Sequence, residues 1–184
     1  MGQRDKYDGN FELHLDPAAS FQIKLRPKNF TPPTSGNIDV TNMTDVVAQI
    51  TIRAALEAGH TDLKLTGELS KTGMGDGQLG AFAYNTKITK CDLSGVTGWG
   101  TSATLPGSAF AGCTALQEVV LPGDVQVIGE YAFFNCTALT TVNLPQVTRI
   151  DQYAFQVCTS LAELTLDNVC LLYTSPSPRD VEES

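Results

Sequence analysis

The chain has 184 residues, of which 42% are hydrophobic and 17% charged, a composition typical of a folded protein rather than a wholly disordered one. Its 20 acidic and 12 basic residues give a formal net charge of −8. This charge repels phosphate backbones and anionic lipid surfaces, which makes nucleic acid a poor candidate partner. The chain contains no run of about 18 apolar residues, so we expect no membrane insertion of this segment.

Residues 1–40 are predicted to form a strand pair followed by a linker. Apolar and polar residues alternate in Phe11–Asp16 and again in Phe21–Arg26, as is typical of half-buried strands. Pro17–Ser20 between them suits a turn, so we expect the two segments to pair as a β-hairpin. Asn29–Asn37 contains two prolines and a Ser-Gly pair and is interpreted as the linker.

The next element is a predicted capping helix within residues 41–60. We expect the helix itself over Met43–Ala58, with Thr41 or Asn42 as its N-cap and Gly59 just past its end. Apolar residues cover most of its circumference, so the helix must be buried on more than one side. It is therefore expected to close the open end of the structure that follows.

The chain after this helix repeats one phrase. Residues 109–116, 132–139 and 154–161 read AFAGCTAL, AFFNCTAL and AFQVCTSL, and their phenylalanines lie 23 and then 22 residues apart. Residues 81–88 form a degenerate copy, with Phe82 in the phenylalanine position. A fixed period of this size predicts a solenoid, in which each coil buries its apolar face against its neighbours. Strand-like segments are expected at 62–66, 90–94, 118–122, 141–145 and 163–167.

One coil is longer than the others, because Phe82 and Phe110 lie 28 residues apart. The extra residues fall within Gly95–Ser102, which contains Trp99. Insertions in repeat proteins emerge as loops, often on the binding face. Trp99 is interpreted either as an exposed anchor for a protein or a sugar, or as a side chain that folds back over its own coil.

The repeated phrase, followed by x-x-[VL]-x-L-P and by an [IV]-x-x-x-A-F return as in Val127–Phe133, resembles the BspA-like leucine-rich repeat. The resemblance covers roughly residues 61–167 and implies a right-handed solenoid with one short parallel strand per coil. It also implies a bacterial surface or secreted protein that binds other proteins or host matrix. We therefore predict a β-rich α/β fold, with a leucine-rich-repeat solenoid over 61–169 after the helical cap and the hairpin-like segment.

Three of the five cysteines, Cys113, Cys136 and Cys158, share one column of the repeat. A parallel ladder spaces side chains by about 4.8 Å, which does not suit the shorter Cβ separation of a disulfide. We interpret them as small buried apolar residues, with a thiolate metal site as the alternative. The only histidines, His14 and His60, are expected to be far apart and on the surface. We predict no catalytic residues, no metal and no cofactor.

The end of the chain differs from the repeat. Residues 170–180 break the repeat in mid-coil and resemble the translation of one reading frame of a common transposase-type sequencing adapter. The resemblance implies that residues from about Cys170 onward are not biological and that the natural protein continued into further coils. The alternative is a genuine disordered tail rich in serine and proline, residues 170–184. We expect no function after Val169 in either case.

The remaining candidate for function is the surface of the predicted strands. Side chains alternate along a strand, so the residues next to the buried ones point outward and form rows across the coils. The candidate partner-binding set is Lys64, Lys90, Asp92, Glu118, Val120, Thr141, Asn143, Glu163 and Thr165, together with Trp99. We predict a non-catalytic module for protein binding or adhesion, extracellular or at the cell surface, with a protein or matrix ligand. A structural spacer and a carbohydrate-binding accessory module are the alternatives.

Overall fold

The computed structural model describes residues 11–15, 23–27, 29–70, 74, 81–99, 103–144, 146–162 and 164. The chain falls into two units, Met1–Pro32 and Pro33–Ser184. In the first unit, β1 (Phe11–Leu15) pairs antiparallel with β2 (Ile23–Pro27). This pairing confirms the predicted hairpin.

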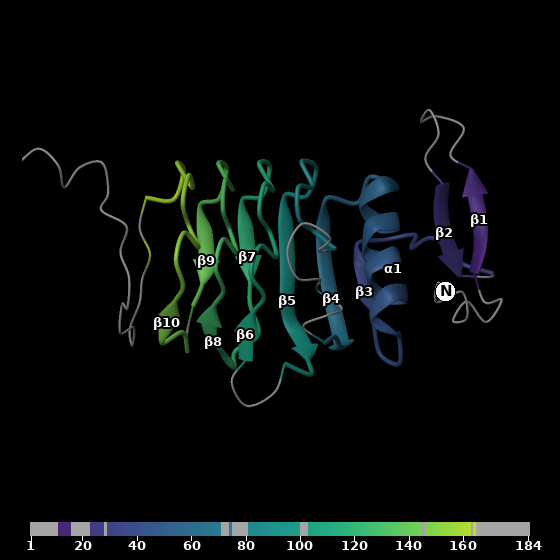
Figure 1. Cartoon of the computed structure of the whole chain (residues 1–184), viewed down its shortest axis with the longest axis horizontal. Helices are drawn as coiled ribbons and strands as arrows, with labels where there is room; N and C mark the ends of the chain where they lie inside the picture. The colour runs from purple at the N-terminus through teal and green to yellow at the C-terminus, as the bar shows by residue number, and fades with distance from the viewer. Residues whose placement is uncertain are drawn as a thin grey trace, which may run out of the picture. The chain divides into compact units, whose positions relative to one another are not determined.

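The second unit is a solenoid, and its described residues form two parallel sheets (Figure 1). The main sheet has the strand order β3 (Asn37–Asp39), β4 (Asp62–Glu68), β5 (Lys90–Thr97), β7 (Glu118–Val120) and β9 (Thr141–Asn143). The second sheet has the order β10 (Arg149–Ile150), β8 (Val125–Ile128) and β6 (Ala103–Leu105). Each later coil supplies one strand to each sheet, so neighbouring coils are joined by hydrogen bonds on two sides.

Two features of these sheets differ from the predicted layout. No strand is predicted for residues 37–39, of which Asn37 ends the expected linker, yet they form β3, with Ile38 buried and paired with Leu65 of β4. None of the three strands of the second sheet was predicted. They are two to four residues long, so their sequences carry too few alternating positions to indicate a strand.

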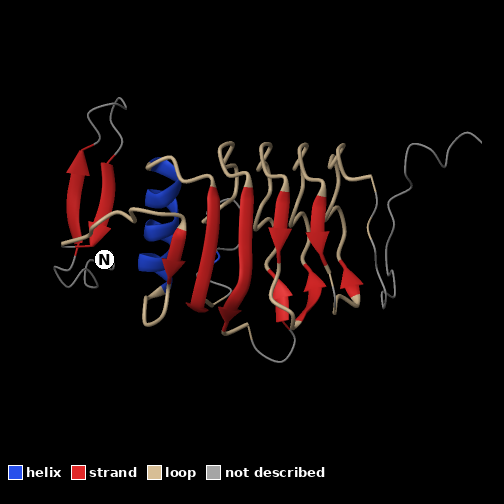
Figure 2. Cartoon of the chain, turned by 180° about the vertical axis from the view of Figure 1, so that it is seen from behind, coloured by secondary structure: helices blue, strands red, loops and turns tan. Residues whose placement is uncertain are grey.

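The predicted capping helix is present as α1 (Asp45–Glu57), at the β3 end of the stack (Figure 2). Its N-cap is Thr44, whose side chain accepts a hydrogen bond from the backbone N–H of Val47, so the predicted caps Thr41 and Asn42 are wrong. Gly59 follows the helix with φ +94°, as predicted. The buried face of α1 belongs to the same apolar core as the strand leucines, through Ala48, Ile52, Ala55 and Leu56.

The repeated phenylalanines form one continuous stack inside the solenoid. The ring centroids of Phe82 and Phe110 lie 5.0 Å apart, those of Phe110 and Phe133 5.4 Å, and those of Phe133 and Phe155 5.1 Å. The first three rings are fully buried, and Phe155 is partly buried at the last described coil. The columns inferred from the repeat are therefore interior, as predicted.

The cysteine column is also interior, but each thiol has a hydrogen bond that the sequence did not reveal. Cys113 donates from Sγ to the carbonyl oxygen of Phe82, Cys136 to that of Phe110, and Cys158 to that of Phe133, each at 3.1 Å. All three are free of disulfides. Burial raises the pKa of the Cys113 thiol to about 12, so this thiol is protonated at neutral pH and serves as a donor between coils.

Each coil also turns through two residues in the left-handed backbone region. The first position is occupied by Ser108, Tyr131 and Tyr153, and the second by Tyr84, Gly112, Asn135 and Val157, all with φ between 57° and 73°. Glycine adopts this conformation without penalty and asparagine at low cost, whereas other residues lose about 1–2 kcal/mol. A β-branched residue such as Val157 is a genuine outlier there.

Candidate interaction surface

The predicted binding residues lie in two rows on the outward side of the main sheet. The register places Asp62, Lys90, Glu118 and Thr141 side by side, and beside them Lys64, Asp92, Val120 and Asn143. We call these eight residues the strand face. The residues between them, such as Leu63, Cys91 and Val119, are buried. The alternation predicted from the sequence therefore holds for β4, β5 and β7, whereas in β9 the inward residue Val142 is only partly buried.

Four of the five charged residues of the strand face form ion pairs with one another. Lys64 Nζ lies 3.0 Å from Asp92 Oδ2, and Lys90 Nζ lies 3.2 Å from Glu118 Oε2. Both pairs join neighbouring strands and are substantially exposed to solvent. Exposed pairs of this kind contribute about 0–1 kcal/mol each to stability. Their main effect here is that four of the candidate residues do not offer an isolated charge to a partner.

Asp92 is the strand-face carboxylate with the most hydrogen bonds. Burial raises the pKa of Asp92. The hydrogen bonds from Ser94 and Lys64, together with the positive charge of Lys64, lower it by more. The backbone N–H of Ser94 donates to Asp92 Oδ1 at 2.9 Å. The pKa of Asp92 therefore lies below its usual value of 3.8, and the residue is ionised at any physiological pH.

The strand face is uncharged at its C-terminal end. Val120 and Thr141 carry no charge, and Asn143 Oδ1 accepts a hydrogen bond of 2.6 Å from the backbone N–H of Leu121. This bond fixes the Asn143 amide against the preceding coil and leaves its NH₂ group as a donor. The same face thus has an ion-paired half on β4 and β5 and a neutral half on β7 and β9, with Glu118 between them.

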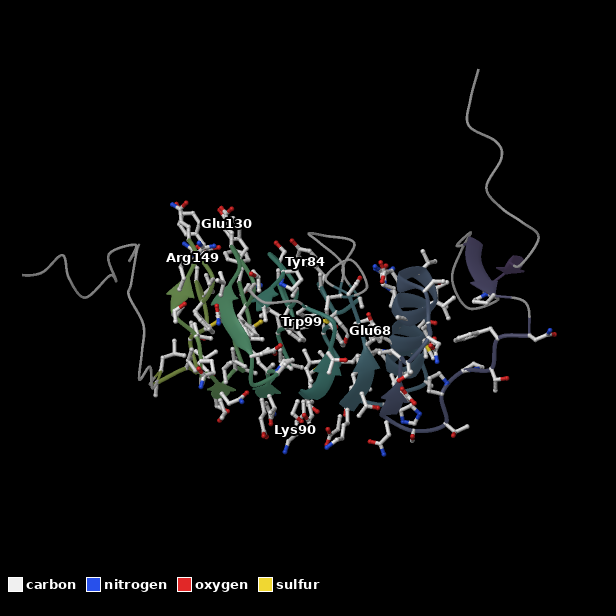
Figure 3. The ribbon with its side chains drawn as sticks, turned by 90° about the horizontal axis from the view of Figure 1, so that it is seen from below. Glu68, Tyr84, Lys90, Trp99, Glu130 and Arg149 are labelled. Carbon is white, nitrogen blue, oxygen red and sulfur yellow. The ribbon has the colours of Figure 1, made fainter. Side chains whose placement is uncertain are left out.

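Three of the predicted site residues do not join this surface as described. Glu163 and Thr165 lie outside the described residues. Trp99 is only 4% exposed, and its Nε1 finds no acceptor among the described residues. Figure 3 shows its side chain in the interior of the solenoid. Trp99 is therefore buried and offers no ring face to a protein or a sugar, which rules out the interpretation as an exposed anchor.

The described residues contain no group of three or more His, Cys, Asp or Glu side chains that could hold a metal ion. Burial raises the pKa of the Cys91 thiol well above its ordinary value of 9.0. The thiols of Cys91 and Cys113 are therefore poor nucleophiles at neutral pH. Within the described part of the chain, no helix is both long and apolar enough to cross a membrane.

A comparison with family models identifies the repeat. The model described as BspA type leucine-rich repeat region matches residues 78–174 in six copies, which is more than half of the chain. The chain belongs to the BspA-type leucine-rich-repeat family. This match confirms the resemblance inferred from the A-F-x-x-C-T-[AS]-L phrase, and the parallel sheets confirm a β-rich α/β solenoid.

Two solved structures are similar to parts of this BspA-type chain. The leucine-rich repeat protein of T. pallidum is 37% identical, with 35% of this chain and 36% of that chain covered and a TM-score of 0.30. A leucine-rich cell surface protein of Faecalibacterium prausnitzii is 22% identical, with 79% and 32% covered and a TM-score of 0.42. The match thus spans about a third of the length of each. None of the curated proteins matches the chain.

Proposed function

We propose that this BspA-type solenoid is a non-catalytic protein-binding module of a surface or secreted protein, and that it engages its partner through the strand face. The observation that carries the proposal is the register of the main sheet, which sets outward side chains of four strands in two continuous rows. Rows of this kind suit a partner that runs across the strands.

The neutral half of the strand face is the proposed centre of contact. A partner that covered Lys64 and Asp92 would remove water from an ion pair that is already formed, which yields little or no net affinity. Burying Val120 and Thr141 removes no charge from water, and apolar area contributes about 25 cal/mol per Å². Glu118 lies at the margin, and the predicted residues Glu163 and Thr165 would extend the same rows.

The location outside the cell is also part of this proposal. The family resemblance supports it, because proteins with BspA-like repeats are expected at the surface or in the medium. The ligand in this setting is a protein of the extracellular matrix or of another cell. The same reasoning makes adhesion the expected consequence of binding.

The test measures binding of the purified chain to immobilised purified matrix proteins by surface plasmon resonance. Replacing Val120 and Thr141 together by lysine places two charges in the neutral half, and we expect at least about a tenfold loss of affinity, as for a hot-spot residue. Asn143 is left intact because its side chain holds the backbone of Leu121. Replacing Gln126 and Thr148 together by lysine is the matched control, since both are exposed uncharged residues at the second sheet, in β8 and beside β10.

Three outcomes would contradict the proposal. Equal loss in the control with lysine at Gln126 and Thr148 and in the strand-face variant would show that net charge, not the strand face, governs binding. Turnover of any substrate by the purified chain would contradict the non-catalytic assignment. If no matrix protein binds and an unrelated solenoid can replace this region without loss of adhesion, the module is a spacer.

A further inference from the structure

A second group of solvent-accessible side chains lies on the turns, away from the strand face. It consists of Tyr84, Tyr131, Phe134, Tyr153 and Val157, which we call the turn face. Figure 3 shows Tyr84 and Glu130 on the opposite side of the solenoid from Lys90 of the strand face. The turn face is therefore separate from the surface proposed above.

Four residues of the turn face adopt a left-handed backbone conformation that their residue types disfavour, Tyr131 and Tyr153 at the first position of their coils and Tyr84 and Val157 at the second. Tyr84 and Val157 both occupy the second left-handed position of their coils, with φ 60° and 64°. In the two coils between them this position holds Gly112 and Asn135, which adopt the conformation more easily. The fold therefore does not require a tyrosine or a valine there. Their side chains are 54% and 45% exposed, so each keeps about half of its surface open to a ligand.

The aromatic side chains of the turn face are held in place by one another. Tyr131 stacks on Tyr153 at 5.0 Å between centroids and meets Phe134 edge to face at 5.6 Å. Each of the two stacked tyrosine rings thus has one face covered by the other ring. Their hydroxyl groups can donate hydrogen bonds to the carbonyl oxygens of a peptide backbone.

The charge beside this surface is negative. Glu130 is exposed and makes no ion pair within the described part of the chain, whereas Arg149 is held by Asp151 at 2.8 Å. Burial, and then the Glu130 carboxylate and the Tyr153 hydroxyl, raise the pKa of Tyr131, which keeps this hydroxyl protonated as a donor. A partner with a basic side chain would find an unpaired carboxylate there.

We propose that the turn face is a second docking surface, and that its occupant is an extended protein segment with a lysine or arginine next to apolar residues. Tyr84 and Val157 lie three coil steps apart, about 14 Å at a spacing of about 4.8 Å. An extended segment of about four or five residues spans this distance. The basic side chain pairs with Glu130, and the apolar residues cover Val157 and the tyrosine edges.

The test selects short random-sequence peptides, displayed on phage, against the immobilised full chain. Enriched peptides are then synthesised, and their affinities are measured by fluorescence anisotropy. The main variant is Tyr84→Asn with Val157→Asn, which installs the residue that Asn135 already provides in the equivalent position. The single change Val157→Asn is expected to raise the thermal unfolding midpoint by about 2–4 °C, because it relieves a strained backbone. A loss of binding there cannot be ascribed to unfolding.

We expect the enriched peptides to contain lysine or arginine and to lose at least about tenfold in affinity on the double variant. Glu130→Gln should weaken binding and remove most of its salt dependence. The strand-face variant with lysine at Val120 and Thr141 should bind the peptides normally, even if it loses matrix proteins. Peptides without basic residues, equal binding to the double variant, or a glycan-array signal abolished by the same changes would each overturn the proposal.

Discussion

The phenylalanine stack makes a quantitative prediction about where the solenoid derives its stability. Phe110 is fully buried and stacks on Phe82 and Phe133, whereas Phe155 is partly buried and stacks only on Phe133 among the described residues. An aromatic pair contributes about 0.5–1.5 kcal/mol beyond its buried area, and a change of shape in a packed core costs under about 1.5 kcal/mol. We therefore expect Phe110→Leu to cost about 2–4 kcal/mol and Phe155→Leu about 0.5–1.5 kcal/mol.

Urea unfolding can measure this difference, followed by far-ultraviolet circular dichroism and by the fluorescence of Trp99. Trp99 is the only tryptophan, and it is buried in the coil next to the Phe82–Phe110 stack, so it reports on that region. The two costs differ by about 2 kcal/mol, so with a slope of about 1–3 kcal/mol per molar urea the midpoints of the two variants should lie about 0.7–2 M apart. Equal midpoints, or a larger loss for Phe155→Leu, would refute the assignment of Phe110 as a central rung of a continuous core.

Three further predictions concern single groups. Gly112→Ala should destabilise the chain by about 1–2 kcal/mol, because φ is +73° and the new Cβ would lie 2.6 Å from Tyr84 Cδ1. In thermal unfolding, the same change should cost less stability when Tyr84 is also replaced by asparagine. Burial raises the pKa of the Cys113 thiol from 9.0 to about 12, so the free energy of unfolding should keep the full contribution of this thiol below pH 9 and lose about 1.4 kcal/mol per pH unit as the pH rises toward 12. In alkaline denaturation, the Cys113→Ala variant should therefore lose stability less steeply with pH. Because the pKa of Asp92 is lower in the folded chain, its contribution to the free energy of unfolding is complete above the pKa that Asp92 has in the unfolded chain, and it is lost as the pH falls through the pKa of the folded chain. The Asp92→Asn variant should therefore lose less stability on acidification, by less than about 1 kcal/mol.

The repeat made the main sheet predictable because a period fixes register. Strand starts expected at 62, 90, 118 and 141 are the residues that pair across the sheet, as Asp62 with Lys90, Lys90 with Glu118 and Glu118 with Thr141. A period shows which positions are equivalent, and stacking places equivalent positions side by side. The outward rows followed from that alone, and so did the interior position of Phe110 and its counterparts.

The features that the sequence did not indicate depend on partners rather than on pattern. β3 is a strand because Ile38 fits against Leu65, although two of its three residues are polar. The thiol of Cys136 donates to the carbonyl oxygen of Phe110, and no side-chain pattern reveals a backbone acceptor 26 residues away. The burial of Trp99 depends on the path of an inserted segment, and flanking glycines say little about where such a segment leads.

The two faces of the solenoid provide evidence of different strength about function. On the strand face an outward position accepts almost any side chain, because the backbone ladder holds the strand whatever the residue. A lysine or a threonine there is compatible with simple solvation. On the turn face the left-handed positions are restricted, and Gly112 and Asn135 show what the fold alone selects. Tyr84 and Val157 depart from that choice while exposing apolar surface, which supports the proposal that they contact a ligand. The stability of the Val157→Asn variant therefore bears directly on function: a chain that becomes more stable and loses its ligand would show that this strain is retained for binding.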